Sequence, residues 1–107
     1  MLDSDFNQFI YFIITTEVDK KKAYKIADLL LEEKLTPCVS FKNIESHFWW
    51  GGEIKKSKEV QLIIKCAEKN INKLYKLISQ YHSYEVPEII SFPASANNDY
   101  YRWVDSF

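Results

Sequence analysis

Two short runs of this chain are apolar at nearly every position, rather than at every second or third. They span residues 9–14, Phe-Ile-Tyr-Phe-Ile-Ile, and residues 60–64, Val-Gln-Leu-Ile-Ile. A strand with one face in water alternates apolar and polar side chains, whereas a continuous apolar run is typical of a strand covered on both faces. The first run is also far too short to cross a bilayer. The chain must therefore place two central strands between two covering layers.

Two segments carry apolar residues at the 3.6-residue spacing of an amphipathic helix, over 19–34 and 68–81. Asp19 is placed to cap the first helix. Pro37 disfavours the α conformation at Thr36, and we expect it to stop this helix. The apolar positions that define the two helical faces are Ala23, Ile26, Ala27, Leu30 and Leu31 in the first, and Ile71, Leu74, Tyr75 and Ile78 in the second.

A long hairpin is predicted between the two helices. An extended segment begins at Cys38 and continues to the pair Gly51-Gly52, and a second extended segment returns from Ile54 to Ile64. Glycine tolerates positive φ, which a two-residue hairpin turn requires. The polar stretch 55–59 is expected to be exposed. The predicted hairpin is therefore longer than the core requires.

The last quarter of the chain predicts one more strand and a short helix. Pro87 introduces an apolar segment over residues 89–92, and we expect Pro93 to close it. Asp99 is placed to cap a short C-terminal helix rich in aromatic residues. This helix carries Tyr100, Tyr101, Trp103 and Val104.

The order βαββαβ predicts an α+β, ferredoxin-like sandwich with an antiparallel sheet, a long hairpin between the second and third strands and a short C-terminal helix, all in a single domain over residues 1–107. Both long helices pack on one face of such a sheet, which leaves the apolar second face uncovered. Self-association would cover it, unless the C-terminal helix folds beneath the sheet. Aromatic residues suited to such an interface are Phe48, Trp49, Trp50 and Trp103.

Charge and cysteine usage exclude several classes of function. The 14 basic and 15 acidic residues nearly cancel, so no basic field points to nucleic acid or to an anionic membrane. Asp3 and Asp5 precede the first apolar run in place of the basic region of a secretory signal, which predicts a cytoplasmic protein. Cys38 and Cys66 lack metal-binding spacing and are expected to be packed thiols.

Several short motifs stand in a defined order along the chain. They are Thr15-Thr16, Lys34-Leu35 with Cys38-Val39, Ser46, Phe48, Trp50, Gly52, Ile54, Glu59-Val60, Ile64-Lys65, His82, Tyr84-Glu85, Pro87-Glu88-Ile89, Tyr100 and Trp103. In this combination the chain resembles the CutA divalent-cation tolerance family over nearly its whole length. The resemblance implies a tightly packed homotrimer of ferredoxin-like subunits, similar in fold to PII signalling proteins. It also implies a role in tolerance of divalent cations, with copper binding in some members.

The resemblance also indicates where a metal would bind. Members that bind copper have a pattern with a Cys in the first strand and a His-His pair after the second helix. The corresponding residues here are Thr15, Tyr81 and His82, and Ser83 stands where the family usually has Pro. Copper prefers imidazole and thiolate donors, and of these only His82 is present.

The candidate metal ligands are therefore His82, Glu85 and Glu88, around the loop that enters the last strand. In the alternative interpretation His82 ends the second helix as a favourable cation or hydrogen-bonds a carbonyl, while the two carboxylates are ordinary loop or interface groups. His47 lies on the hairpin beside Phe48, where an exposed or interface position is expected.

Three classes of function remain open. The first is a trimeric divalent-cation or metal-ion response protein, or a PII-like sensor of a small molecule bound between subunits. The second is an enzyme with a small site at Tyr84, His82 and the two carboxylates. No nucleophile with a base partner and no glycine-rich phosphate loop is visible among only two glycines, so we expect no enzyme. The third is a trimeric scaffold that anchors another protein.

Overall fold

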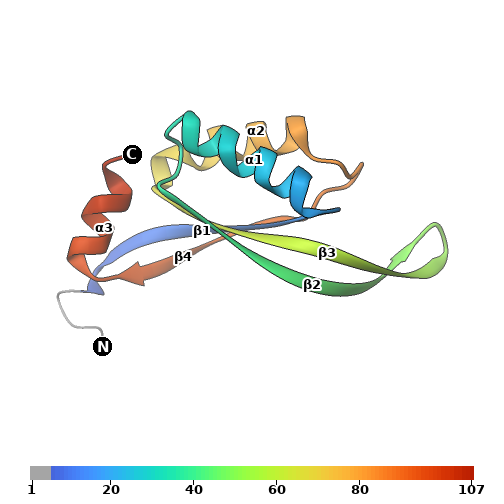
Figure 1. The fold of residues 1–107 in the computed structure, drawn as a ribbon. Helices are drawn as coiled ribbons and strands as arrows, with labels where there is room; N and C mark the ends of the chain where they lie inside the picture. The colour runs from blue at the N-terminus through green and yellow to red at the C-terminus, as the bar shows by residue number, and fades with distance from the viewer. Residues whose placement is uncertain (1–5) are drawn as a thin grey trace.

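The computed structural model describes residues 6–107 and confirms the predicted ferredoxin-like α+β fold. Four antiparallel strands form one sheet in the order β2-β3-β1-β4. Both long helices lie over the same face, and the β2–β3 hairpin extends beyond them (Figure 1). In chain order the elements are β1 (Gln8–Glu17), α1 (Lys20–Glu32), β2 (Cys38–Trp50), β3 (Glu53–Cys66), the 3₁₀ turn η2 (Glu68–Asn70), α2 (Ile71–Tyr81), β4 (Ile89–Ala96) and α3 (Asn98–Asp105).

The main core lies between the sheet and the two long helices. Ile13 on β1 lies opposite Ile64 on β3, and both side chains are fully buried against the helices. This confirms that the two continuous apolar runs are the central strands. The buried residues that the helices contribute are Ala23, Ile26, Ala27 and Leu30 from α1, and Leu74 and Ile78 from α2.

Helix α1 begins as predicted and ends earlier than predicted. The Asp19 carboxylate accepts the backbone N–H of Lys22 at 2.8 Å, which caps the helix. The helix ends at Glu32, because Lys34 adopts a left-handed conformation with φ of 55°. The N–H of Leu35 then donates to the carbonyl of Leu30 at 3.1 Å, as in a Schellman motif. The expectation that Pro37 stops the helix is therefore wrong, since the chain has already turned.

The β2–β3 hairpin is the longest feature of the molecule. Gly51 and Gly52 have φ of 61° and 77°, the positive pair that a tight hairpin turn requires. Trp50 pairs with Glu53 across this turn, and the pairing continues to Cys38 and Lys65. The radius of gyration is 15.1 Å, against about 13 Å for a compact chain of this size. The hairpin accounts for this elongation because it projects past the helices (Figure 1).

The end of the chain differs from the prediction in two respects. Strand β4 continues through Pro93 to Ala96, because β4 is an edge strand and needs no N–H donor on its free side. The N-cap of α3 is Asn97, and Asp99 lies in the first turn, where it pairs with Arg102. The small cluster that α3 forms over the end of the sheet contains Ile10, Ala96 and Val104, with Phe12, Tyr100 and Tyr101 around it.

The face of the sheet opposite α1 and α2 is called the open face here. Phe12 and Phe92 pair across β1 and β4 on this face, with ring centroids 5.3 Å apart. Ile90 and Phe92 remain 49% and 40% exposed. Within the described residues, α3 is the one α-helix that lies apart from α1 and α2. It packs only against one end of the sheet, where Val104 contacts Ile10 of β1 (Figure 1). Most of the open face therefore has no covering element among residues 6–107.

Candidate functional site

His82 lies in a buried hydrogen-bonded cluster directly after α2. Its side chain is completely buried. The Nδ1 atom accepts the backbone N–H of Tyr84 at 3.0 Å, and Nε2 lies 3.1 Å from the hydroxyl oxygen of Thr15. Because Nδ1 acts as an acceptor, the ring proton is on Nε2, which donates to Thr15. Both ring nitrogens are therefore used within the fold.

Glu17, at the end of β1, also belongs to this cluster, although no sequence pattern indicates it. Its side chain is also completely buried. Its two carboxylate oxygens accept the backbone N–H groups of Val18 at 2.8 Å and Ser83 at 2.9 Å. The second oxygen lies 3.8 Å from Nδ1 of His82. A buried carboxylate is tolerated only when it is hydrogen-bonded, so Glu17 fixes the loop after α2 to the end of the central strand.

A second polar pair lies beside this cluster. The hydroxyl of Tyr84 donates to Oε2 of Glu59 at 2.5 Å. Glu59 is only 7% exposed, so the expectation that the whole polar stretch 55–59 is exposed is wrong at this residue. Burial raises the pKa of the Tyr84 hydroxyl, and the hydrogen bond to Glu59 and the negative charges of Glu59 and Glu17 raise it further. Tyr84 therefore stays a neutral donor, and it anchors the loop to the open face.

A recess of about 820 Å³ opens where this loop meets the base of the hairpin. One wall is the loop segment 83–88, and the floor is the open face of β2 and β3. Glu85 and Glu88 line it, but His82 does not. The structure thus brings two of the three predicted metal ligands to one recess and leaves the imidazole in the adjacent buried cluster. The other lining residues are Thr16, Ile44, Ser46, Phe48, Trp49, Trp50, Lys55, Glu59, Gln61, Ser83, Tyr84 and Val86.

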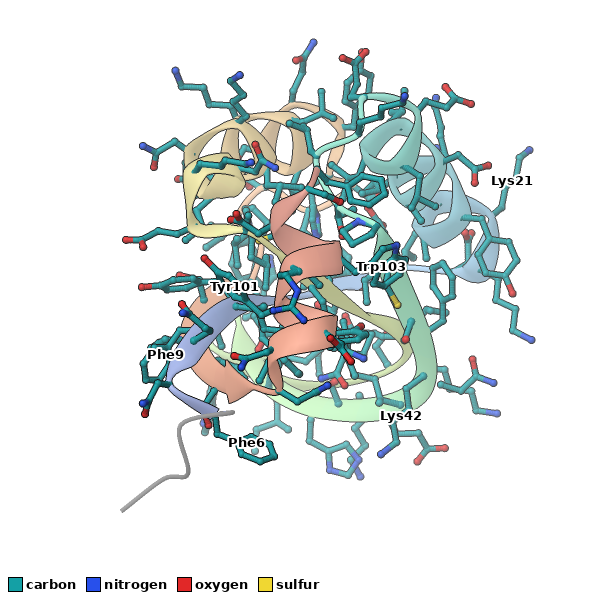
Figure 2. The ribbon with its side chains drawn as sticks, turned by 90° about the vertical axis from the view of Figure 1, so that its left-hand side faces the viewer. Phe6, Phe9, Lys21, Lys42, Tyr101 and Trp103 are labelled. Atoms are coloured by element: carbon teal, nitrogen blue, oxygen red, sulfur yellow. The ribbon has the colours of Figure 1, made fainter. Side chains whose placement is uncertain are left out.

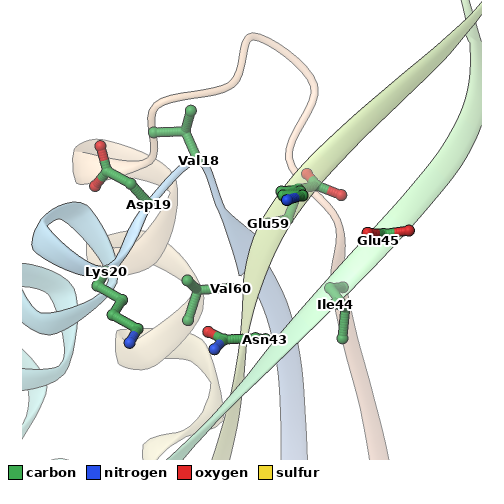
Figure 3. A pocket seen from close by; sticks show the side chains of 9 residues that line it. Val18, Asp19, Lys20, Asn43, Ile44, Glu45, Glu59 and Val60 are labelled. Atoms are coloured by element: carbon green, nitrogen blue, oxygen red, sulfur yellow. The ribbon is translucent and has the colours of Figure 1, made fainter.

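A second cavity of about 540 Å³ lies at the start of α1. Figure 3 shows Lys20 on one side and Asn43 and Glu45 on the other. Its charged side chains have mixed sign, with Asp19, Glu45 and Glu59 set against Lys20 and Lys58. This mixture favours no single ligand charge.

The four predicted interface aromatics lie at two ends of the molecule. Phe48, Trp49 and Trp50 are on the hairpin and are 39%, 71% and 49% exposed. Trp103 is on α3 at the other end, where it projects away from Tyr101 (Figure 2). Trp103 is 46% exposed, and its ring packs on Tyr100 and Phe107 of the same subunit.

The metal donors of one subunit are dispersed. In the part of the chain that the structure describes, no three His, Cys, Asp or Glu side chains are grouped so that they could hold a metal ion. Cys66 is buried in the core, and burial raises the pKa of its thiol from 9.0 to about 12. His47 is exposed on the hairpin. Residues 6–107 of one subunit therefore contain an organised recess but no preformed metal centre.

The fold and the recess define a class of protein: a small α+β subunit with an uncovered sheet face and a ligand-sized hollow beside it. The family profile described as CutA1 divalent ion tolerance protein matches residues 11–106. The chain belongs to this family. It is 34% identical to the divalent-cation tolerance protein CutA of Pyrococcus horikoshii over 93 residues, which cover 86% of this chain and 91% of that protein.

Two further comparisons agree with this assignment. The structure of the periplasmic divalent cation tolerance protein CutA from Archaeoglobus fulgidus matches with a TM-score of 0.88 and 32% identity, over 91% of this chain and 96% of that one. A chloroplastic CutA 1 protein of rice is 33% identical over 86% of this chain and 53% of its own length. These relatives are named for different compartments, so a cytoplasmic location stays a prediction. No helix among residues 6–107 is long and apolar enough to cross a membrane.

Proposed function

We propose that this protein acts in divalent-cation tolerance as a homotrimer, whose subunits cover one another's open sheet faces. The observation that carries the proposal is the exposed apolar surface on the open face and hairpin. Ile90 and Phe92 on β4 and Trp50 on the hairpin are between 40% and 49% exposed. Exposed apolar and aromatic side chains of this kind are typical of an interface between subunits.

The edges of the sheet are compatible with a closed ring of subunits. Strands β2 and β4 form the two edges, and an unpaired edge strand is a ready surface for pairing with another chain. Because the two edges differ, a contact between β2 of one subunit and β4 of the next is head-to-tail, and such contacts close into rings when the rotation permits. The count of three subunits comes from the family resemblance.

A copper centre within one subunit does not fit these residues. Copper needs several imidazole or thiolate donors, and both nitrogens of His82 already have partners within the fold. Glu85 and Glu88 line the recess without a third grouped donor among the described residues. A cation held by these two carboxylates requires further donors from a neighbouring subunit or from water.

A binding role is favoured over a catalytic one by the state of the reactive groups. The Cys66 thiol has a pKa raised by burial to about 12, so it is protonated and inert at neutral pH. The Tyr84 hydroxyl is hydrogen-bonded to Glu59 and has a raised pKa. Neither group is activated as a nucleophile or base.

Native mass spectrometry of the metal-stripped protein tests the assembly. We expect three subunits for the unmodified protein and dissociation for Ile90→Lys, which places a charge on the open face. The matched control is Tyr75→Lys on α2, which is 55% exposed on the outer side of the helix layer and should leave the trimer intact. A monomeric unmodified protein would refute the proposal.

Titration with copper and then zinc in the same instrument tests the metal hypothesis. Ions bound in multiples of three and lost in Glu85→Gln/Glu88→Gln would support a site shared between subunits. Loss on His82→Ala with the fold intact would instead support His82 as a ligand, against the single-subunit geometry. No bound ion would remove direct metal binding from the proposal and leave the trimer.

The recess favours one second candidate function, a PII-like trimeric sensor of a small molecule. Ligand sites in proteins are concave, and about 300–1,000 Å³ is their usual size. The recess of about 820 Å³ falls in this range. Its lining combines aromatic and aliphatic side chains with polar and charged groups that could orient a ligand.

A further inference from the structure

The helix layer carries an excess of positive charge that the count over the whole chain hides. Together α1, η2 and α2 contain seven lysines and three carboxylates, all of them exposed, which gives these elements a net charge of +4. The rest of the described chain has seven basic and ten acidic residues, a net charge of −3. The fold therefore separates charges that nearly cancel in the sequence. The lysines are Lys20, Lys21, Lys22, Lys25, Lys69, Lys73 and Lys76, and the carboxylates are Asp28, Glu32 and Glu68.

The positive charge is concentrated at one end of the helix layer. Helices α1 and α2 run antiparallel, so the start of α1 lies beside the end of α2, on the side of the hairpin (Figure 1). The three carboxylates lie toward the other end, in the second half of α1 and in η2. We call the end beside the hairpin the basic end. It consists of Lys20, Lys21, Lys22 and Lys25 in the first half of α1 and Lys76 in the second half of α2.

The lysines of the basic end are not neutralised within the fold. The three ion pairs among residues 6–107 lie on the hairpin, in the buried histidine cluster and on α3, and none of them includes a lysine of the basic end. The nearest carboxylate along the chain, that of Asp19, accepts the N–H of Lys22 as the helix cap. Lys21 projects outward from α1 (Figure 2). Exposed ammonium groups of one sign attract an oppositely charged partner and speed its association.

Two tyrosines add contact area at the same end. Tyr24 on α1 is 47% exposed and Tyr81 at the end of α2 is 41% exposed. The ring of Tyr24 stands edge-on to Phe41 of β2, with ring centroids 4.8 Å apart, so its position is fixed by packing. A tyrosine presents an apolar ring and a polar hydroxyl, and it is enriched in interfaces between proteins. The basic end thus combines charge with aromatic surface.

These features favour a protein partner over a bilayer or a nucleic acid. The helix layer lies on the opposite side of the sheet from the open face, so it stays exposed in the proposed trimer (Figure 1). Three such layers face outward in different directions, and a flat bilayer cannot meet all of them. Arginine is the preferred residue for phosphate recognition, but Arg102 lies on α3, where it pairs with Asp99.

We propose that the basic end docks an acidic segment of a partner protein, in which apolar or aromatic side chains stand among the carboxylates. The carboxylates pair with the lysine ammonium groups, and the apolar side chains pack on Tyr24 and Tyr81. The proposal goes beyond the proposed function and does not depend on it, because the open face and the basic end lie on opposite sides of the sheet.

Fluorescence anisotropy with a labelled peptide of about 16 residues, the repeat Glu-Glu-Phe-Glu, tests the proposal at about 0.15 M salt. The control peptide has the repeat Gln-Gln-Phe-Gln. We expect saturable binding of the acidic peptide, at least about tenfold tighter than that of the control. Equal affinity for the two peptides, or no saturable binding of the acidic one, would overturn the proposal.

Two further probes distinguish the other anionic partners. They are oligodeoxythymidylate of about the same length and vesicles that contain phosphatidylserine. We expect neither to displace the bound peptide at an equal concentration of negative charge. Displacement by either probe would assign the basic end to phosphate groups and overturn the choice of a protein partner.

Charge-reversal variants then locate the site. Lys25→Glu/Lys76→Glu should weaken binding of the acidic peptide about tenfold, because two attractive charges become repulsive. Lys56→Glu/Lys58→Glu changes the net charge by the same amount at exposed positions on the hairpin and should leave the affinity within about twofold. Glutamate favours helix about as well as lysine, so the helix variant should fold. Equal losses in the two variants would mean that the peptide responds only to overall charge, and would refute the assignment.

Subunit number, measured separately by native mass spectrometry, keeps the two proposals apart. A trimer that fails to bind the peptide refutes the docking surface and leaves the proposed assembly. A monomer that binds the peptide at the basic end supports the docking surface and refutes the trimer.

Discussion

The imidazole Nε2 of His82 lies 3.1 Å from the hydroxyl oxygen of Thr15, although 66 residues separate the two in the chain. The bond joins the end of α2 to the central strand. The Nδ1 atom of the same ring accepts the N–H of Tyr84, so the imidazole connects three segments. A residue that the family resemblance indicates as a metal donor has a structural role in this subunit.

His82→Ala should therefore lower stability without changing metal stoichiometry. Removal of the ring leaves the Tyr84 N–H and the Thr15 hydroxyl without their partner in a buried cluster, and it opens a cavity. We expect a loss of about 2–4 kcal/mol in the free energy of unfolding. Urea unfolding measures this loss, with His47→Ala on the exposed hairpin as the matched control. An unchanged midpoint for His82→Ala would mean that the cluster contributes no stability.

The hydroxyl of Thr36 makes a comparable link between the loop after α1 and the sheet. Thr36 is fully buried, its Oγ1 lies 2.5 Å from the carbonyl oxygen of Lys65, and it also accepts the N–H of Cys38 at 3.2 Å. Thr36→Val keeps the shape but removes both bonds, so we expect a loss of about 1–3 kcal/mol. Ser40→Ala removes an exposed hydroxyl from the neighbouring strand and should change stability by less than about 0.5 kcal/mol. Chemical denaturation measures both changes, and an equal loss of unfolding free energy in Thr36→Val and Ser40→Ala would contradict the stabilising role of the Thr36 hydroxyl.

Patterns that depend on neighbouring residues were predictable from the sequence. The two apolar runs located the central strands, Asp19 located the start of α1, and Gly51-Gly52 located the hairpin turn. Each of these features depends on backbone preferences or on periodicity within about ten residues. The order of the elements then restricted the topology to the arrangement that is observed.

Features that depend on distant residues were not predictable in this way. Pro93 is tolerated within β4 because that strand lies at the sheet edge, which its own sequence does not reveal. Glu17 follows a β-prone run, and its partners Val18 and Ser83 become visible only when the loop after α2 is in place. The contact between Tyr84 and Glu59 likewise joins segments 25 residues apart. The sequence consequently indicated the loop residues and His82, but not the buried partners Glu17 and Glu59.

Lys34→Gly should stabilise the protein. Lys34 adopts φ of 55°, a left-handed conformation in which a Cβ atom costs about 1–2 kcal/mol. Glycine removes this cost but gains entropy in the unfolded chain, so we expect a net gain of about 0.5–1 kcal/mol. Glu33→Gly is the matched control, because Glu33 has φ of −77° and glycine should lower stability there. The midpoint temperature of thermal unfolding should rise for Lys34→Gly and fall for Glu33→Gly. Shifts of the same sign would refute the strained conformation at Lys34.

We expect the folded protein to lose stability at alkaline pH because of the buried Cys66 thiol. Burial raises the pKa of its thiol from 9.0 to about 12 in the folded protein. Below pH 9 the thiol is protonated in both states, and between pH 9 and 12 the unfolded chain loses this proton while the folded chain keeps it. Folding then takes up a proton, so stability should fall by about 1.4 kcal/mol per pH unit as the pH rises above 9.

The comparison of Cys66→Ala with Cys38→Ala isolates this effect. Cys38→Ala removes a half-buried thiol and should retain the alkaline loss. Cys66→Ala should be less stable than the unmodified protein at pH 7, because it leaves a small cavity in the core. The difference in unfolding free energy between the unmodified protein and Cys66→Ala should shrink by about 2 kcal/mol between pH 7 and pH 10.5. Only the unmodified protein has the thiol whose proton the folded state retains. Urea unfolding under reducing conditions at pH 7 and 10.5 measures both differences, and a gap that stays constant would show that the Cys66 proton is not linked to folding.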